Sequence, residues 1–468
     1  MKVDVLTHKS GTSAGLVFLD PYAVNGPTTG QSGALILDNA GNPVWFRPLP
    51  STDLMNSDFR AQRLGGHSVL TFWQGTIASP STATNLPPGS AEPGACFYIY
   101  DSHYRFMGSL TPKNGWAADV HEFLLTPQGN ALYISLKTVP MDLTSYGGPS
   151  IGSVNDEEVQ EVDLATGKLV FTWDELKHVS LSDSEIPAST ANASDGYVWD
   201  AFHMNSLDLG PHNQLLISSR NMWAVYNVDM TDGRILWQLG GKKSDFAFPQ
   251  STATFSWQHM ARFRPGNDVS VFDDGCCESP TSPATGQSHG LVLHLDFRRR
   301  TAMSVVTYFH NPALSASSQG SFQALANGDE MVGWGAEPYY SEYAPGGNTE
   351  HDGAQHLLYD VRMPGSNISY RVFRNDWVGT PSYPPSVVAR RSGGQTVVHA
   401  SWNGSTLTTA WRVLSGPRAD ALSVVRARAA STGFETAIVI GTAGSYYEVD
   451  ALGASGAVLG TSAVTRAR

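Results

Sequence analysis

The sequence is poor in cysteine and lacks both long apolar runs and helical periodicity. Only three of its 468 residues are cysteines, Cys96, Cys276 and Cys277, too few for a disulfide framework. A bridge between adjacent cysteines is strained, so we expect all three to be free thiols, or Cys96 to pair with one of the other two. No Cys-x-x-Cys or His-Glu-x-x-His spacing occurs, and we therefore predict no metal site.

Charge and hydropathy argue against a nucleic-acid-binding protein and against a membrane-spanning one. The formal net charge is −12 and no basic patch is present apart from "RRR" at 298–300, which argues against a nucleic-acid partner. No run of 18 apolar residues occurs, so we expect no membrane span. The first residues, "MKVDVLTHKSGTSAG", lack the apolar centre of a signal peptide. As written, the sequence predicts a cytoplasmic protein, or a secreted one if a leader was removed, and it leaves the oligomeric state open.

Turn-forming and aromatic residues are abundant, with 46 Gly, 27 Pro, 12 Trp, 17 Tyr and 19 Phe, which favours strands joined by many turns. One pattern recurs six times: a polar or aromatic start, a turn that usually contains Gly, and a short β-rich run. Its copies are 61–73, 121–135, 203–218, 258–272, 322–335 and 387–402. A second pattern, Asp followed by a Gly turn and an apolar run, marks tight hairpins at 38–46, 163–173, 229–239 and, more weakly, 450–462.

These repeats predict an all-β protein, a six-bladed β-propeller with long inter-strand loops. The alternative is a seven-bladed propeller in which the N-terminal segment completes a blade. Residues 1–468 are expected to form a single domain, with the last strands closing the ring against the first.

Three successive repeat units begin with histidines, His121, His203 and His259. Equivalent positions of successive blades converge on the axis of a propeller, and imidazoles are costly to bury without partners. Asn205 follows His203 by two residues, and Arg220 ends the next strand, where its guanidinium could bind a sulfate, phosphate or carboxylate. The alternatives are structural: a packed histidine, an ion pair between blades for Arg220 and a strand hydrogen bond for Asn205.

Several segments resemble the arylsulfotransferase family, in particular its fungal and actinobacterial branch. They include "DVHEFLLT" at 119–126, "WDAFHMNSLD" at 199–208, "LLISSRNMWAVYNVD" at 215–229, "WQHMARF" at 257–263 and "MVGWGAEPYYSEY" at 331–343. The resemblance implies a β-propeller enzyme without a cofactor. It also implies PAPS-independent transfer of a sulfuryl group from a phenolic sulfate to a phenolic acceptor through a sulfohistidine.

The resemblance also implies roles for individual residues. His259 matches the histidine that takes the sulfuryl group, and His203, His121, Arg220 and Asn205 match its central polar neighbours. Such donors stabilise the negative charge of the group in transfer. Four aromatic residues are candidates to stack on the substrate, with the blade core as the alternative for each: Trp257, Trp223, Tyr339 and Tyr340.

The sequence departs from the family pattern at three positions. Met260 stands where the family has Asp after Gln-His, and Asp274 and His289 stand where we expect Asn and Arg. Loss of a carboxylate that orients the imidazole would weaken the nucleophile. One alternative is therefore a lyase or natural-product cyclase that uses the same residues as acid, base and anion site. A second alternative is a propeller that binds without catalysis.

Overall fold

The computed structural model describes residues 2–23, 28–76, 94–277, 286–441 and 444–468. These residues form an all-β structure whose helical parts are all short. They comprise α1 (Glu175–His178) and the 3-10 turns η1 (Thr144–Tyr146), η2 (Leu181–Asp183), η3 (Ala188–Thr190), η4 (Ala193–Asp195), η5 (Arg220–Met222) and η6 (Ser251–Ala253). None of the helices in the described residues has the length and apolar character needed to cross a bilayer.

Residues 4–375 of the described chain form six sheets of four or five strands, here called the sheet ring. In hydrogen-bonding order, the first is β28 (Val372–Asn375), β2 (Leu16–Leu19), β4 (Gly33–Leu37), β5 (Pro43–Pro48). The second is β6 (Met55–Leu64), β7 (His67–Gly75), β8 (Cys96–Asp101), β9 (Phe106–Leu110). The third is β10 (Ala117–Leu125), β11 (Asn130–Pro140), β12 (Ser153–Asp163), β13 (Leu169–Asp174), with β14 (Val198–Trp199) beside β12.

The fourth sheet is β15 (Met204–Leu209), β16 (Gln214–Ser219), β17 (Ala224–Asp229), β18 (Ile235–Gly240). The fifth is β19 (His259–Arg264), β20 (Asp268–Asp273), β21 (His289–Asp296), β22 (Thr301–Phe309). The sixth is β23 (Ser321–Ala324), β24 (Glu330–Gly333), β25 (Tyr339–Tyr343), β26 (Leu357–Arg362), β1 (Asp4–His8). A small pair, β3 (Tyr22–Ala23) with β27 (Asn367–Ile368), completes this part.

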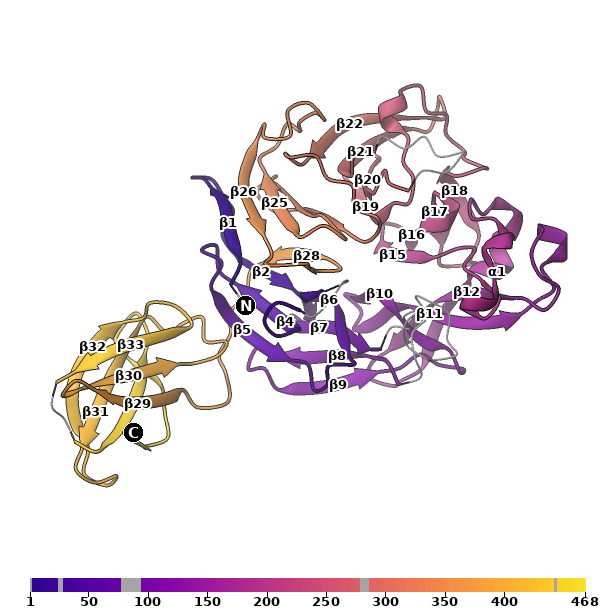
Figure 1. Cartoon of the computed structure of the whole chain (residues 1–468). Helices are drawn as coiled ribbons and strands as arrows, with labels where there is room; N and C mark the ends of the chain where they lie inside the picture. Colours follow the sequence, from indigo (N-terminus) through magenta and orange to yellow (C-terminus); the bar gives the residue numbers. More distant parts are fainter. Residues whose placement is uncertain (1, 24–27, 77–93, 278–285, 442–443) are drawn as a thin grey trace.

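The six sheets close on themselves around a common centre (Figure 1). Strands β6, β10, β15, β19, β23 and β28 each contact the next, and β28 also contacts β6. Closure comes from the N-terminal segment, because β2 pairs with β28 and β1 pairs with β26. The prediction that the last strands of the chain close the ring is therefore wrong.

Hydrophobic cores lie between neighbouring sheets, one for each neighbouring pair. Strand β4 shows how the sequence produces them. Successive side chains of a strand point to opposite faces, so Leu35 and Leu37 pack towards the sixth sheet while Ala34 and Ile36 pack towards the second. Because both faces are covered, β4 is buried along its whole length and its sequence is almost continuously apolar.

Residues 386–468 form a separate pair of sheets, here called the C-terminal unit, with its own core. One sheet is β29 (Ser386–Ser392), β30 (Gln395–Ser401), β33 (Glu435–Ile440); the other is β32 (Ser423–Ala430), β31 (Ala410–Gly416), β34 (Tyr446–Leu452), β35 (Val458–Thr461), with β36 (Thr465–Arg466) beside β34.

The first five repeat copies are the first hairpins of five sheets of the ring, but the copy at 387–402 is the β29–β30 hairpin of the C-terminal unit. Its assignment to the ring is wrong. A hairpin pattern fits any antiparallel sheet and does not specify which one.

Candidate active site

Three imidazoles meet near the centre of the sheet ring. The ring centroids of His121 and His203 are 4.9 Å apart. Tyr370 lies between the histidines, 5.5 Å from His121 and 6.4 Å from His259 by ring centroids. The structure thus brings together the three histidines that begin successive repeat units.

Irregular backbone positions these side chains. Strands β6, β10, β15 and β19 each have a register shift near the start, which bends the strand and redirects a side chain. His203, Trp257, Met260 and Gln319 have positive φ values of 59°, 61°, 50° and 73°. Left-handed backbone at residues other than glycine is strained and concentrates at functional sites.

Each histidine has an aspartate against its Nδ1 atom. The Nδ1–carboxylate distances are 2.7 Å for His121 with Asp119, 2.6 Å for His203 with Asp200, and 2.6 Å for His259 with Asp274. A carboxylate on Nδ1 fixes the orientation of the imidazole and favours the tautomer with its proton on Nδ1. This arrangement leaves the Nε2 atom of each histidine for other partners.

The contacts of His259 define which of its two ring nitrogens carries the proton. The backbone N–H of Gln319 lies 3.2 Å from Nε2, and a backbone amide can only donate. Nε2 is therefore unprotonated and accepts from Gln319 through its lone pair, and Nδ1 carries the proton and donates to Asp274. Burial, Arg220 and the other two histidines lower the pKa of His259 well below its usual value, which keeps the imidazole neutral.

Asp274, and not residue 260, places a carboxylate against His259. The Met260 side chain is buried in the apolar core between the first and second sheets, and its sulfur accepts from the Phe322 backbone N–H at 3.3 Å. The carboxylate against His259 comes instead from Asp274, two residues beyond Phe272, which pairs with His259 in the β19–β20 hairpin. His259 thus has a carboxylate partner although residue 260 is a methionine.

Arg220 lies at the start of η5 and faces the same centre. Its Nη2 donates to the Ser317 carbonyl at 3.0 Å, and its guanidinium carbon lies 4.8 Å from the centroid of the Trp257 ring. Burial lowers the pKa of Arg220, while Asp274 and Asp200 oppose that shift. The guanidinium still stays charged at neutral pH, because a free arginine has a pKa above 12.

Cys276 and Cys277 form a disulfide with each other, and Cys96 is a buried free thiol. The expectation of free thiols or a bridge to Cys96 is wrong. The two Cα atoms are 3.7 Å apart, below the usual range for bridges, and the pair is accommodated in a loop rather than in a strand. The sulfur of Cys276 packs with Trp223 and Trp257, whose rings meet edge to face at 5.2 Å.

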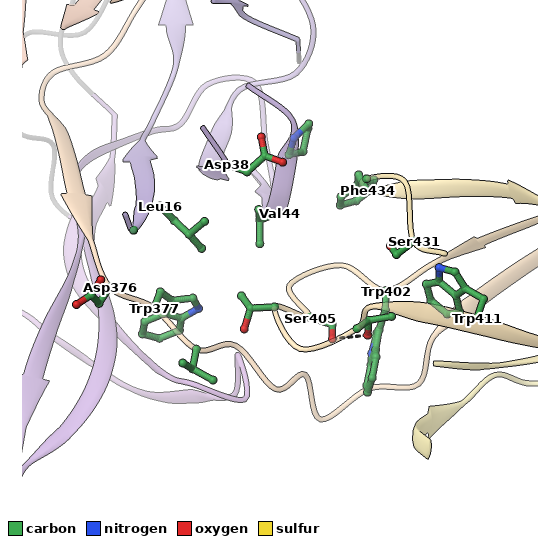
Figure 2. Close-up of a pocket in the computed structure, with 16 residues that line it drawn as sticks. Leu16, Asp38, Val44, Asp376, Trp377, Trp402, Ser405, Trp411, Ser431 and Phe434 are labelled. Carbon is green, nitrogen blue, oxygen red and sulfur yellow. Dashed lines mark hydrogen bonds between the residues drawn. The ribbon is translucent and has the colours of Figure 1, made fainter. Parts of the chain in front are cut away.

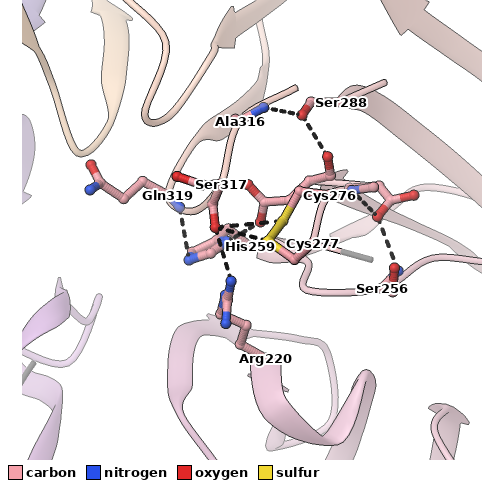
Figure 3. Close-up of a disulfide and its surroundings, with 12 residues drawn as sticks. Arg220, Ser256, His259, Cys276, Cys277, Ser288, Ala316, Ser317 and Gln319 are labelled. Carbon is pink, nitrogen blue, oxygen red and sulfur yellow. Dashed lines mark hydrogen bonds and ion pairs between the residues drawn. A yellow bond between two sulfur atoms is a disulfide. The ribbon is translucent and has the colours of Figure 1, made fainter. Parts of the chain in front are cut away.

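A strap formed by residues 314–319 covers His259 (Figure 3). The Ser317 carbonyl accepts from Arg220 and lies 3.5 Å and 3.6 Å from the sulfurs of Cys276 and Cys277. Ser288 ties the strap to the loop that carries Asp274. Its hydroxyl donates to the Asp274 carbonyl at 2.5 Å and accepts from the Ala316 N–H at 2.7 Å.

The other residues singled out from the sequence lie outside the group of three histidines. Asn205 is buried and its amide donates to the Gln258 carbonyl at 2.7 Å, next to His259. Tyr339 packs against His310, with ring centroids 4.8 Å apart. Tyr340 is fully buried in the core between the first and sixth sheets, so the prediction that it stacks on substrate is wrong. His289 is stacked on Phe309 at 4.5 Å instead of joining the histidine cluster.

A buried ionic cluster supports this centre from within the sheet ring. Arg371 lies 2.8 Å from Asp58 and 3.0 Å from Glu122, and its guanidinium donates to the Asn205 carbonyl at 2.8 Å. Arg60 and Arg262 also pair with Glu122. Burial alone would raise the pKa of Glu122, but the three arginines hold it well below its usual value. Among the described residues, no group of histidine, cysteine and acidic side chains is arranged to hold a metal ion.

The family model described as Arylsulfotransferase (ASST) matches residues 97–353, more than half of the chain. The chain belongs to the arylsulfotransferase family. The matched region includes every histidine, aspartate and cysteine of the central site, whereas Tyr370 lies beyond it. No curated protein sequence matched this chain.

Two solved structures are similar to this arylsulfotransferase-family chain at low TM-scores. A protein from Bacteroides caccae has a TM-score of 0.43 at 10% identity and covers 77% of this chain and 98% of its own. Virginiamycin B lyase from Staphylococcus aureus has a TM-score of 0.35 at 10% identity, with coverages of 73% and 85%.

Several residues of the histidine site were not predicted from the sequence. Asp119 and Asp200 precede their histidines by two and three residues, a local signal that could have found them. Asp274 is 15 residues from His259 and could have been found only from the hairpin register. Tyr370 and Gln319 come from links between strands, where no sequence pattern indicated a role.

Proposed function

We propose that this arylsulfotransferase-family chain transfers a sulfuryl group from an aryl sulfate to a phenolic acceptor through Nε2 of His259. The observation that carries the proposal is the tautomer of His259. The Gln319 N–H requires a lone pair on Nε2, and Asp274 holds the proton on Nδ1. A neutral, oriented imidazole nitrogen is a competent nucleophile.

The first step forms the Nε2–S bond and breaks the S–O bond to the aryl group. His203 in its imidazolium form, with Nδ1–H held by Asp200, gives its Nε2 proton to the departing phenolate. It is the most accessible histidine of the cluster, with a side chain 24% exposed. In the second step His203 takes the proton of the phenolic acceptor, whose oxygen forms the new S–O bond as the N–S bond breaks. Nucleophilic transfer thus divides one reaction into two steps.

Arg220, together with His121 in its imidazolium form, stabilises the negative charge that spreads over the sulfuryl oxygens. The side chain of His121 is 9% exposed and is held by Asp119, and Arg220 lies close enough to Asp274 and Asp200 to affect its pKa. Fixed donors in a site with little water stabilise such charge strongly. Trp223 and Trp257 would contact the aryl group from the side of the disulfide.

Substrate access requires the strap to move. His259 is 1% exposed, and the Gln319 N–H occupies the atom that must attack sulfur. The donor would displace residues 317–319, and Arg220 would exchange the Ser317 carbonyl for a sulfuryl oxygen. The strap contains no regular secondary structure, which suits a segment that opens at low cost.

We further propose that the six sheets of the ring are the six blades of a propeller and that the chain belongs to the fungal and actinobacterial branch of the family. The closed cycle of inner strands supports the blade count. The quoted motifs support the branch. Small aryl substrates follow from the family.

A second candidate is a lyase or cyclase in which the histidine–aspartate pairs serve as acid and base. The occupied Nε2 of His259 and the greater exposure of His203 favour it. In that reaction His203 would act on substrate and His259 would help to hold the site.

Two measurements test the proposal. We expect release of nitrophenolate from 4-nitrophenyl sulfate to depend on a phenol acceptor, and intact mass to reveal one sulfuryl adduct that His259→Asn abolishes. No turnover across a range of phenols, or an adduct that persists in His259→Asn, contradicts transfer through this residue. Activity that survives in His259→Asn but not in His203→Ala, with folding shown by near-UV circular dichroism, supports the second candidate.

A further inference from the structure

A cavity of 560 Å³ lies where the sheet ring meets the C-terminal unit (Figure 2). Its walls come from Leu16, Asp38 and Val44 of the first sheet region, from the link at 376–378, and from residues 402–411 and 431–434. Small-molecule sites have volumes of roughly 300–1,000 Å³ and occur preferentially at interfaces between structural units. This cavity has the size and position of such a site.

Hydrogen bonds across the junction fix the walls. The Asn403 side chain accepts from the Phe46 N–H and donates to the Phe46 carbonyl, both at 2.9 Å. The Gly404 N–H donates to the Val44 carbonyl at 2.7 Å. Two wall residues are also anchored, because Trp377 donates to Tyr104 Oη at 2.9 Å and Trp402 to the Tyr383 carbonyl at 2.7 Å. The cavity is therefore preformed.

Aromatic rings and carboxylates dominate the chemistry of the walls. Trp377, Trp402, Trp411 and Phe434 supply the rings, and Asp38 and Asp376 supply the carboxylates. Among the residues that the structure describes, no lysine, arginine or histidine lines the cavity. A negative, aromatic lining disfavours anions such as aryl sulfates and favours cations, which are attracted to ring faces and to carboxylates.

The hydroxyl groups of the lining do not favour a ligand rich in hydroxyls. Ser405 and Thr408 are hydrogen-bonded to each other at 2.7 Å, and Thr406 accepts from the Gly379 N–H at 3.0 Å. Part of their hydrogen-bonding capacity is thus used within the protein. Asp376, in contrast, is exposed and Phe434 is 38% exposed, so both remain available to a ligand.

We propose that this cavity binds a quaternary alkylammonium ligand, with the cation between the aromatic rings and near Asp376. The lining of the cavity contains none of the residues of the histidine cluster, so the cavity is a second site. Its proposed ligand is a cation, whereas an aryl sulfate is an anion. The proposal does not depend on the reaction proposed for His259.

The test compares choline with 3,3-dimethyl-1-butanol, its uncharged carbon analogue, by titration calorimetry on the full chain. We expect choline to bind and the analogue to bind about tenfold more weakly or not at all. Asp376→Asn and Phe434→Ala, both at exposed positions, should each weaken choline binding by about threefold to tenfold.

Matched controls lie elsewhere on the surface. Asp420 has a side chain 73% exposed and pairs with Arg418 at 3.0 Å, and Phe106 is 56% exposed on the edge strand β9. Asp420→Asn and Phe106→Ala should leave choline binding unchanged. Absence of choline binding, equal binding of the analogue, or loss in the controls but not in the cavity variants overturns the proposal. Saturable binding of a neutral saccharide in place of choline would overturn it in favour of a carbohydrate.

Discussion

Replacing Asp274 with asparagine removes the carboxyl group that accepts from Nδ1 of His259. Burial raises the pKa of this carboxyl well above its usual value, while the nearby Arg220 opposes that shift and favours the charged form. The carboxyl oxygen and Nδ1 are 2.6 Å apart, and both side chains are at most 1% exposed, so water cannot replace the lost interaction. An asparagine oxygen can still accept from Nδ1–H, but without charge. In the other amide orientation the N–H group faces Nδ1 and moves the imidazole proton to Nε2, where it opposes the Gln319 N–H.

The expected size of the effect follows from the hydrogen bond. A hydrogen bond to a charged group contributes about 1.5–3 kcal/mol, which corresponds to roughly 10- to 150-fold in rate if it acts in the transition state. We expect kcat for 4-nitrophenyl sulfate to fall by that factor in Asp274→Asn. Nitrogen-15 NMR of His259 should show the neutral Nδ1–H tautomer at pH 7 in the unchanged protein and loss of that state in the variant.

Asp273 provides the matched control. It is as buried as Asp274 and adjacent to it, but it accepts from the backbone N–H groups of Ser256 and Gly275 at 3.0 Å each. Asp273→Asn should reduce stability while kcat per folded molecule and the His259 tautomer stay unchanged. If Asp274→Asn retains both full activity and the original tautomer, the role assigned to Asp274 is refuted. An altered tautomer with unchanged activity on the true substrate would instead refute attack by His259.

Three further predictions concern the strap and the buried charges. The double substitution Cys276→Ser and Cys277→Ser, or reduction by a dithiol, removes the disulfide packed on the Ser317 carbonyl. Modification of His259 by diethyl pyrocarbonate, measured by peptide mass, should then be about two- to tenfold faster. An unchanged rate contradicts the role of the strap in covering His259. Burial raises the pKa of Glu175 to about 8 in the native state. Between the usual pKa of about 4.5 and pH 8, the native protein therefore keeps a proton that the unfolded chain has already released. Its contribution therefore makes stability fall, by at most about 1.4 kcal/mol per pH unit, as the pH rises from about 4.5 to 8. Glu175→Gln should reduce that slope in denaturant titrations at pH 5.5 and 7.5, and an unaltered slope would show that Glu175 titrates normally. Arg371→Met leaves Asp58 and Glu122 undercompensated and should cost about 3–5 kcal/mol in urea unfolding, whereas a loss below about 1 kcal/mol would contradict a coupled cluster.

The hairpins and the histidines were predictable from the sequence because they depend on local patterns. Turn residues between β-rich runs located the first hairpins of five sheets in the ring, and their shared starting position indicated that His121, His203 and His259 would converge. The same patterns recur in the C-terminal unit, where β29–β30 and β34–β35 form hairpins of a different structure. Local periodicity carries no information about which sheet a hairpin joins.

The sequence alone determined that this protein is built from antiparallel strands and that its histidines begin successive repeat units. Only the tertiary structure decided what those histidines contact. Asp274 reaches His259 across a hairpin, Gln319 reaches it from a strap between two sheets, and neighbouring Cys276 and Cys277 bond to each other beside it. The physical reason is that the protonation and access of an imidazole depend on groups within a few ångströms, and closure of the sheet ring brings those groups together from distant parts of the chain.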